Sequence, residues 1–456
     1  MPLATPSRRT LLQLAGAALL APGLTGARAA AAPIGRVLAI ADMHSAYDQT
    51  GLLLAAFERE VTSVALPHVI AINGDIFEHG NAVSVRSYGA VDWAFLAQAA
   101  QLAPTVVNLG NHDNDLTPDL AEVVARMRSL GVLVVSNIRD TRTGANYAPS
   151  SVTVPFGARR LRVVGVATDA LSTYPRASRD QLSIPVPADW ARAHLAELTE
   201  GPDPVLILSH AGVVADRGIL PFLPDGALMV GGHDHLLFQH RQGRSAYAHT
   251  GSWTSAYTVA DFLNDGSVTA RSVPIGAGAP SSPRLQSLID ATLAAHQTEA
   301  DRAVIGVSSQ ALSVGEAGRR IAAGFAEAAD ADAGFIGHTT LGAGLPAGAV
   351  TRHRFDAVVR FDGRLMTAEV PAAQLSVLMA RANQDRPMPL EQRSGDFVYG
   401  AAASGRRRAR ADVARIVTTD WCATHQAEYF STTDLQFTEI PQSSVKAAAA
   451  TALTLP

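Results

Sequence analysis

Short apolar strands alternate with amphipathic helices from Arg36 to about Pro274, and this pattern constrains the fold more than any other feature of the chain. Short buried strands separated by helices predict an α/β core with helices covering a sheet. The predicted strands are Val37–Ala41, Val69–Ile72, Thr105–Leu109, Val132–Ser136, Leu161–Ala167, Val205–Leu208, Ala227–Val230, Ser245–His249 and Ala256–Phe262. The predicted helices are Gly51–Val61, Trp93–Leu102, Pro118–Leu130 and Ala188–Leu198.

A Gly-, Ala-, Ser- and Pro-rich stretch, Gly276–Pro283, interrupts this pattern and predicts a linker. A predicted helix, Leu285–His296, follows it, and the remaining apolar and amphipathic segments indicate a second, smaller α/β domain. The chain has 456 residues, which is enough for two or three domains. We therefore predict a first domain over residues 33–275, a linker and helix over 276–300, and a C-terminal domain over 301–456.

The N-terminus has the form of a secretory signal. Two arginines, Arg8 and Arg9, precede an apolar stretch from about Leu14 to Leu24, and Ala27-Arg28-Ala29 gives a cleavage pattern of small residues. Paired arginines at this place resemble a twin-arginine export signal. Residues 1–30 are therefore predicted to direct the chain to the periplasm or the outside, with no membrane span left after cleavage. The alternative is a short anchor that is retained, although the stretch is far below the ~20 residues that a span needs.

Net charge and cysteine content exclude several classes of function. The formal net charge is −4, which argues against a partner that is a nucleic acid polymer. Cys422 is the single cysteine of the sequence, so an intramolecular disulfide framework and a Cys-rich metal site are both excluded.

Five short segments of the first domain contain metal-ligand residue types, and each follows an apolar run. Ligands in open α/β sheets bind beyond the carboxyl ends of the strands, so these segments are expected to meet at one edge. Each segment by itself is weak evidence for a metal site, because a lone Asp-x-His or a lone histidine is usually structural. The segments are Asp42-Met43-His44, Gly74-Asp75, Gly110-Asn111-His112-Asp113-Asn114-Asp115, Ser209-His210 and Gly231-Gly232-His233-Asp234-His235.

The residue types indicate two divalent ions. A bridging carboxylate offsets the repulsion between two neighbouring cations, and imidazole, carboxylate and amide oxygen complete a mixed shell of nitrogen and oxygen. A pair of metals roughly 3.5–4 Å apart stabilises the attacking and leaving oxygens of an in-line displacement. Manganese, zinc and iron all suit such ligands, and the sequence does not choose among them.

The order of these five segments resembles the calcineurin-like metallophosphoesterases, and Asn111–Asp115 resembles the corresponding run of the 5′-nucleotidase branch. The resemblance implies one metal held by Asp42, His44 and His235, a second held by Asn111, His210 and His233, and Asp75 as the bridge. It implies that His112 stabilises the transition state or protonates the leaving oxygen, and that Asp115 orients and charges His112. The residues His112 and Asp115 are three apart, which permits contact within one turn.

The C-terminal domain departs from this family. An arginine and an asparagine that 5′-nucleotidases use for the nucleotide are missing, since Thr339–Gly344 and Gly363 stand in those places. Three aromatic residues, Phe361, Trp421 and Tyr429, are candidates for stacking a base, and the alternative is that all three belong to the core.

The sequence therefore predicts an exported hydrolase of phosphate esters with two metals, a 5′-nucleotidase-like phosphatase in which a metal-bound hydroxide attacks phosphorus. The small-molecule substrate is expected to be a nucleoside 5′-phosphate or a related phosphoester. One alternative is a sulfur-ester hydrolase similar to the thiosulfohydrolases, which share this architecture and a similar metal set. Another is a non-catalytic binding protein on the same scaffold. The predicted fold is a metallophosphoesterase sandwich, with helices flanking the sheet core, plus a smaller α/β domain of 5′-nucleotidase type.

Overall fold

The computed structural model describes residues 31–276, 278–403 and 412–454. The predicted signal, residues 1–30, lies outside the described residues. Within the described ranges, no helix has both the length and the apolar character that crossing a bilayer requires.

Two six-stranded sheets form the sandwich of residues 33–274. The first contains, in spatial order, β14 (Val268–Pro274), β13 (Ala256–Leu263), β1 (Pro33–Ile40), β2 (His68–Asn73), β3 (Thr105–Asn108) and β4 (Leu133–Val135). The second contains β11 (Leu237–Gln242), β12 (Ser245–Thr250), β10 (Leu228–Gly231), β9 (Val205–His210), β7 (Arg159–Ala167) and β6 (Ser151–Phe156). The strands β1, β2, β3 and β4 run parallel, as do β7, β9, β10 and β12, so each sheet has a parallel centre.

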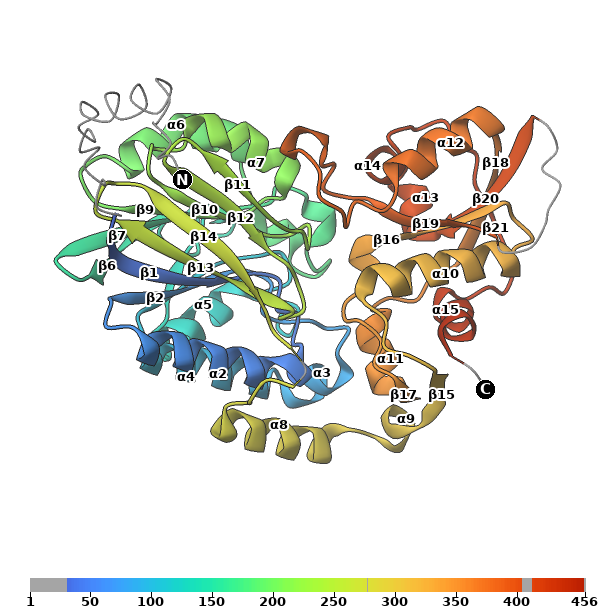
Figure 1. The fold of residues 1–456 in the computed structure, drawn as a ribbon, viewed down its shortest axis with the longest axis horizontal. Coiled ribbons are helices and arrows are strands. Elements are labelled where there is room, and N and C mark those ends of the chain that lie inside the picture. Colours follow the sequence, from blue (N-terminus) through green and yellow to red (C-terminus); the bar gives the residue numbers. More distant parts are fainter. Residues whose placement is uncertain (1–30, 277, 404–411, 455–456) are drawn as a thin grey trace, which may run out of the picture. The chain divides into compact units, whose positions relative to one another are not determined.

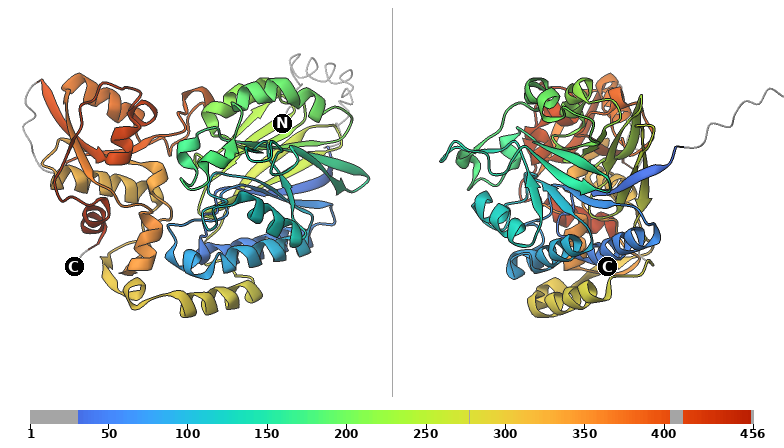
Figure 2. Two further views of the ribbon diagram at one scale, coloured as in Figure 1. Left: turned by 180° about the vertical axis from the view of Figure 1, so that it is seen from behind. Right: turned by 90° about the vertical axis from the view of Figure 1, so that its left-hand side faces the viewer.

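Helices cover the outer face of each sheet (Figures 1 and 2). The helices α2 (Tyr47–Ser63), α4 (Ala90–Leu102) and α5 (Leu120–Ser129) bury their apolar faces against the first sheet. The helices α6 (Pro187–Leu198) and α7 (Val213–Ile219) bury theirs against the second sheet. Val, Leu, Ala and Phe side chains fill the space between the sheets, including Val37, Val69, Leu206 and Val230. The predicted α/β sandwich with flanking helices is therefore confirmed.

The predicted strands and helices agree with the structure at their centres and differ at their ends. The predicted helix Gly51–Val61 begins about one turn earlier, at Tyr47, and the predicted strand Leu161–Ala167 begins at Arg159. The strands β6, β11 and β14 at the edges of the sheets were not predicted. The residues of β11 are at most half-buried. An edge strand pairs on one side only and tolerates polar residues, so the alternation of apolar residues that would predict a strand is weak there.

Residues 299–453 form a smaller α/β arrangement, as predicted from the sequence. Its five-stranded sheet has the order β19 (Val398–Ala402), β16 (Ala333–Gly337), β20 (Val413–Thr419), β18 (Leu365–Pro371) and β21 (Thr438–Glu439), and β15 (Val304–Ser308) pairs with β17 (Gly348–Thr351). The helices are α9 (Glu299–Arg302), α10 (Val314–Ala328), α11 (Arg352–Val358), α12 (Ala372–Arg381), α13 (Asp420–Thr424), α14 (Gln426–Phe430) and α15 (Val445–Leu453). The helix predicted over Leu285–His296 is α8 (Pro283–His296). The exact domain boundaries stay a prediction.

Candidate active site

The carboxyl ends of the parallel strands bring all five predicted segments together. Asp42 follows β1, Asp75 follows β2 and Asn111 follows β3, all in the first sheet, while His210 ends β9 and His233 follows β10 in the second. Two asparagines join the sheets at this edge: the Asn73 amide donates to the Ser209 and Val230 carbonyls at 2.8 and 3.0 Å, and Asn108 donates to the Val166 carbonyl. The site therefore lies across the open edge of the sandwich, as the strand pattern predicts.

Asp42, His44 and His235 form the first of two buried groups of ligand atoms. The Nε2 atoms of His44 and His235 lie 2.9 Å apart, and the Oδ1 atom of Asp42 is 4.0 Å from His235 Nε2. These three residues are the ones predicted to share a metal.

Asp75, His210 and His233 form the second group. His210 Nε2 lies 3.1 Å from Asp75 Oδ2, and His233 Nδ1 lies 2.9 Å from the Oδ1 atom of Asn111. The same Asp75 oxygen lies 4.0 Å from His44 Nε2 in the first group. Asp75 therefore stands between the two groups, where a bridging carboxylate is expected.

The hydrogen bonds of His210 leave a nitrogen available to a metal. Its Nδ1 atom donates to the Asn73 carbonyl at 2.6 Å, so the neutral ring keeps its proton on Nδ1 and offers the Nε2 lone pair to a metal. The buried Nε2 atom has no hydrogen-bond partner among the described residues. Nε2 faces the Asp75 carboxylate at 3.1 Å and the Asp42 carboxylate at 3.8 Å, so without a metal it carries a proton, and a divalent cation would take the place of that proton. Together with the mixed nitrogen and oxygen donors, it fits a divalent cation of the manganese, iron or zinc class.

The backbone around these groups is held in an unusual conformation. Five predicted ligands have a positive φ: Asp42 (53°), His44 (49°), Asp75 (54°), His233 (79°) and His235 (56°). This conformation costs residues other than glycine roughly 1–3 kcal/mol each and persists where surrounding structure enforces it. A Cβ atom at Gly110 would lie 2.3 Å from the Asp75 carboxylate, so this glycine allows the carboxylate its position.

Burial and mutual charge displace the pKa values in the two groups. Burial raises the pKa of Asp42 to about 7. Burial also opposes the charge on His210, but the Asp75 and Asp42 carboxylates outweigh it and raise the His210 pKa to about 10. The pKa of Asp75 falls below its ordinary value because His210 and His112 outweigh the effect of burial. His44 loses basicity because it is buried and lies beside Arg360, so its pKa is well below the usual range.

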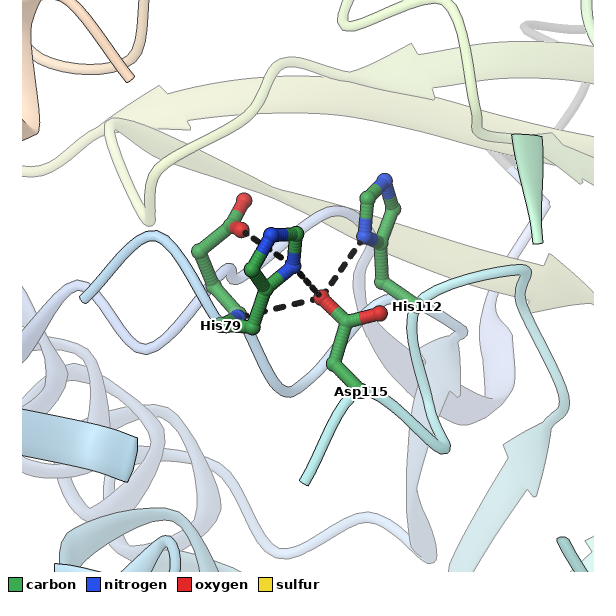
Figure 3. Close-up of side chains that lie close together, drawn as sticks. His79, His112 and Asp115 are labelled. Carbon is green, nitrogen blue, oxygen red and sulfur yellow. Dashed lines mark hydrogen bonds and ion pairs between the residues drawn. The ribbon is translucent and has the colours of Figure 1, made fainter. Parts of the chain in front are cut away.

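His112 and Asp115 contact each other beside these groups, as the sequence predicts (Figure 3). His112 Nδ1 lies 2.9 Å from Asp115 Oδ2. Burial disfavours the charged imidazole, but Asp115 and Asp75 outweigh this and raise the pKa of His112 to about 10. His112 is therefore cationic near neutral pH. Its backbone N–H donates to Asp75 at 2.7 Å, which ties it directly to the central carboxylate.

A second imidazole lies on the same carboxylate oxygen. His79 Nδ1 lies 3.0 Å from Asp115 Oδ2, and the His79 backbone N–H donates to that oxygen at 3.0 Å (Figure 3). The hydrogen bond to Asp115 raises the pKa of His79. The side chain of His79 is 59% exposed, whereas that of His112 is 17% exposed.

A cavity of about 910 Å³ opens over the site. Its floor includes Asp75, Asn111, His112, His233 and His235, and its wall includes all three predicted aromatic residues, Phe361, Trp421 and Tyr429. The Trp421 side chain is 43% exposed, whereas Tyr429 is buried and its hydroxyl contacts Thr339 at 2.9 Å. Trp421 is thus the aromatic face most open to a bound molecule, and Tyr429 supports it through a 3.3 Å hydrogen bond from the indole N–H.

The sequence reasoning missed Glu78 and Arg360. The fully buried Glu78 follows the Gly74-Asp75 segment, and Arg360 stands between the end of α11 and Phe361. Their side chains form a buried ion pair beside His44. Glu78 belongs to none of the segments that carried the motif, and the pairing spans 282 residues, so no local pattern could have indicated it.

A comparison with known protein families matches residues 35–237 to the calcineurin-like phosphoesterases. The chain is also similar to an apyrase of Aedes albopictus, with 23% identity over 229 residues, which cover 46% of this chain and 40% of the apyrase. The chain therefore spans less than half the length of this curated relative. The resemblance to metallophosphoesterases that the sequence motifs predicted is confirmed for this part of the chain.

Solved structures extend the likeness to nearly the whole chain. A 5′-nucleotidase precursor of Thermus thermophilus has a TM-score of 0.62 at 18% identity and covers 92% of this chain and 96% of its own. The sulfate thiohydrolase SoxB of Thermus thermophilus has a TM-score of 0.62 at 15% identity, covering 92% and 94%. A 5′-nucleotidase of Candida albicans has a TM-score of 0.58 at 12% identity, covering 92% and 98%. The shared feature is the fold.

Proposed function

We propose that this chain cleaves phosphate monoesters with two metal ions. The match of residues 35–237 to the calcineurin-like phosphoesterases indicates a hydrolase. The observation that carries the proposal is the position of Asp75. Its carboxylate faces a histidine of each buried group, at 3.1 and 4.0 Å, and accepts the His112 backbone N–H. One carboxylate thereby joins both candidate metal positions to the His112–Asp115 pair.

In this proposal one metal is held by Asp42, His44 and His235, and the other by His210, His233 and Asn111, with Asp75 between them. Two divalent ions so held would supply Lewis acidity and an activated water. The role of His112 follows from its charge. A cationic imidazole on the cavity floor donates a hydrogen bond to the phosphoryl group or a proton to the leaving oxygen. Asp115 orients this imidazole by accepting from Nδ1, which leaves Nε2 directed away from Asp115.

The proposed substrate class is the nucleoside 5′-phosphates. The cavity has room for a nucleotide, and its wall carries an exposed indole at Trp421 and a half-buried ring at Phe361. Aromatic faces of this kind stack nucleobases. The apyrase and the two 5′-nucleotidases similar to this chain agree with a nucleotide substrate. A sulfur ester is kept as the competing substrate because SoxB matches the fold equally well.

The test is a substrate panel on metal-loaded protein with and without His112→Ala. The panel contains nucleoside 5′-monophosphates and diphosphates, glycerol phosphate, an aryl phosphate and a thiosulfate ester. We expect nucleotide turnover that falls about 10²–10⁴-fold in the variant, whereas His240→Ala, on the edge strand β11, serves as the matched control. Turnover of the other phosphates alone would retain the phosphoesterase and reject the nucleotide. Hydrolysis of the thiosulfate ester alone would reject both.

We also propose that the chain is exported by a twin-arginine signal, on the evidence of Arg8, Arg9 and the apolar stretch that follows. The expected result is a periplasmic or secreted product whose N-terminus begins near Ala30. Replacing both arginines by lysine should retain the protein in the cytoplasm. Export that is indifferent to this replacement would reject the twin-arginine route.

A further inference from the structure

Arg360 extends from the C-terminal part of the chain to the side of the first metal group. Its side chain is 3% exposed, and its guanidinium lies between the rings of Trp253 and Phe361, with Cζ 4.8 and 4.7 Å from their centroids. Its Nη1 atom donates to the Thr339 carbonyl at 3.0 Å. Its Nη2 atom pairs with Glu78 and lies 3.3 Å from Nδ1 of His44. An arginine at this depth needs a carboxylate partner, because an unpaired buried charge is strongly destabilising.

Glu78 is held in one orientation by contacts at both of its carboxylate oxygens. Oε1 accepts the Gly80 backbone N–H at 2.8 Å, while Oε2 pairs with Arg360 and lies 3.5 Å from His44 Nδ1. His44 in turn stacks on Trp253, with ring centroids 5.0 Å apart and an interplanar angle of 26°. The imidazole plane is therefore fixed by the indole, and its outward nitrogen faces the Glu78 carboxylate.

The tautomer of His44 decides whether it can bind a metal. Its Nε2 atom faces His235, so a metal in the first group needs a lone pair on Nε2 and a proton on Nδ1. A protonated Nδ1 requires an acceptor. The 3.3 Å hydrogen bond from Arg360 Nη2 needs a lone pair on Nδ1 and therefore favours the other tautomer, whereas the Glu78 carboxylate, 3.5 Å away, is the acceptor that a protonated Nδ1 requires.

We propose that Glu78 and Arg360 are positioning residues that complete the first metal group from outside its ligand set. Glu78 supplies the acceptor that the metal-binding tautomer of His44 needs, and Arg360, which donates to Nδ1 when no metal is bound, holds the Glu78 carboxylate in place. The C-terminal part of the chain thus sets the metal affinity of the N-terminal sandwich. This inference rests on the proposed function, because it requires a metal at Asp42, His44 and His235.

The experiment titrates Zn²⁺ into metal-free full-length protein against a chromophoric chelator and resolves the affinities of the two ions. Loss of a carboxylate partner to a ligating histidine typically costs 10–100-fold in metal affinity. We expect Glu78→Gln and Arg360→Lys each to lower the affinity for one of the two zinc ions by about this factor and to leave the affinity for the other unchanged. Glu60→Gln and Arg36→Lys are the matched controls, since they alter a partly buried ion pair on α2 and β1 that does not contact the site.

A third variant guards against loss of folding. Glu78→Gln combined with Arg360→Met removes both charges together, which avoids an unpaired buried ion, and it should still weaken a single zinc ion. The proposal is overturned if all three variants bind two zinc ions as tightly as the wild type. If Arg360→Lys only raises KM for the phosphate ester, Arg360 is a substrate contact instead. A wild-type protein that binds no Zn²⁺ would overturn the proposed function as well, whereas two tight ions with unaffected variants would reject this inference alone.

Discussion

His44 and His235 face each other with their Nε2 atoms 2.9 Å apart, although they follow strands of opposite sheets of the sandwich. Two neutral imidazoles at this distance can share one hydrogen, but two lone pairs would repel each other. Burial and Arg360 hold the pKa of both rings well below the usual range. Neither imidazole is therefore protonated to a cation, and the repulsion between the two lone pairs is not relieved in that way. A cation between the rings would satisfy both lone pairs, and this arrangement leads to the first prediction.

Removal of metal should inactivate and destabilise the protein. Because a ligand that binds only the folded state stabilises it by RT ln(1 + [L]/Kd), free metal at 100 times Kd contributes about 2.7 kcal/mol per site. A chelator should therefore abolish turnover and lower Tm by several degrees, and Mn²⁺ or Zn²⁺ should restore both. Differential scanning calorimetry with and without chelator measures the effect. An unchanged Tm would mean that the two buried groups do not hold metal.

Metal binding should release protons, and its affinity should rise with pH. His210, with its pKa raised to about 10 by Asp75 and Asp42, must lose a proton to coordinate a metal, and below about pH 7 Asp42 must lose one as well. Affinity should therefore increase by about tenfold per pH unit for each proton released. Isothermal titration of Mn²⁺ in two buffers that differ in ionisation enthalpy counts these protons. A heat that is independent of the buffer contradicts the prediction.

His79 should assist catalysis through Asp115. The His79→Gln substitution removes the imidazole hydrogen bond to the Asp115 oxygen that His112 also contacts. Its loss should cost about 1 kcal/mol, which corresponds to roughly a fivefold fall in kcat. His112→Ala should cost about 10²–10⁴-fold, and both variants should retain two metals. Steady-state kinetics at matched metal content separates these effects. Equal losses in the two variants would instead give His79 a part as large as that of His112.

Asp92 should make the protein lose stability as pH rises. This buried carboxyl accepts from Ser45, Tyr47 and Ser84, and burial raises its pKa to about 7. Because the folded pKa exceeds the unfolded value, the folded state retains a proton that the unfolded chain releases between about pH 4 and 7. Stability contributed by this group is therefore lost across that window, by up to roughly 4 kcal/mol.

Asp92→Asn removes this titration while keeping a carbonyl oxygen as the acceptor. The variant should lose less stability than the wild type between pH 4 and 7, as measured by urea unfolding at fixed metal content. Asp180→Asn, at an exposed position, is the control and should leave the wild-type profile unchanged. Parallel profiles for the wild type and Asp92→Asn would show that Asp92 is already charged when buried.

Trp421 should contribute to the binding of a nucleobase. Stacking of a base on an aromatic ring is worth about 1–3 kcal/mol, so Trp421→Ala should raise KM for nucleotides by about 5–150-fold. Glycerol phosphate has no base, and its kinetics should be unaffected. Tyr88→Ala, which removes an aromatic ring that is 73% exposed and does not line the cavity, is the control. An equal loss for both substrates would show that Trp421 acts on the structure of the site.

Local patterns in the sequence were sufficient to predict the central strands and the candidate ligand residues that follow them. An apolar run of β2 followed by Gly74-Asp75 is such a pattern, since strand propensity, the glycine turn and the ligand type all lie within a few residues. Parallel strands have their carboxyl ends at one edge, so the meeting of Asp42, Asp75, Asn111, His210 and His233 follows from those local patterns. The contact between His112 and Asp115 is equally local.

Only the folded structure shows the contacts between the C-terminal part of the chain and the sheet edge that carries the site. The Glu78–Arg360 pair, the seating of the Arg360 guanidinium on Trp253 and the bond between His338 Nε2 and the Asp234 carbonyl at 2.7 Å join residues more than a hundred positions apart. Such contacts depend on the packing of whole layers, and no periodicity along the chain encodes them. For the same physical reason the sequence indicated Phe361, Trp421 and Tyr429 as equal candidates for stacking a base. The structure distinguishes them, because Trp421 is exposed to the cavity and Tyr429 is buried behind it.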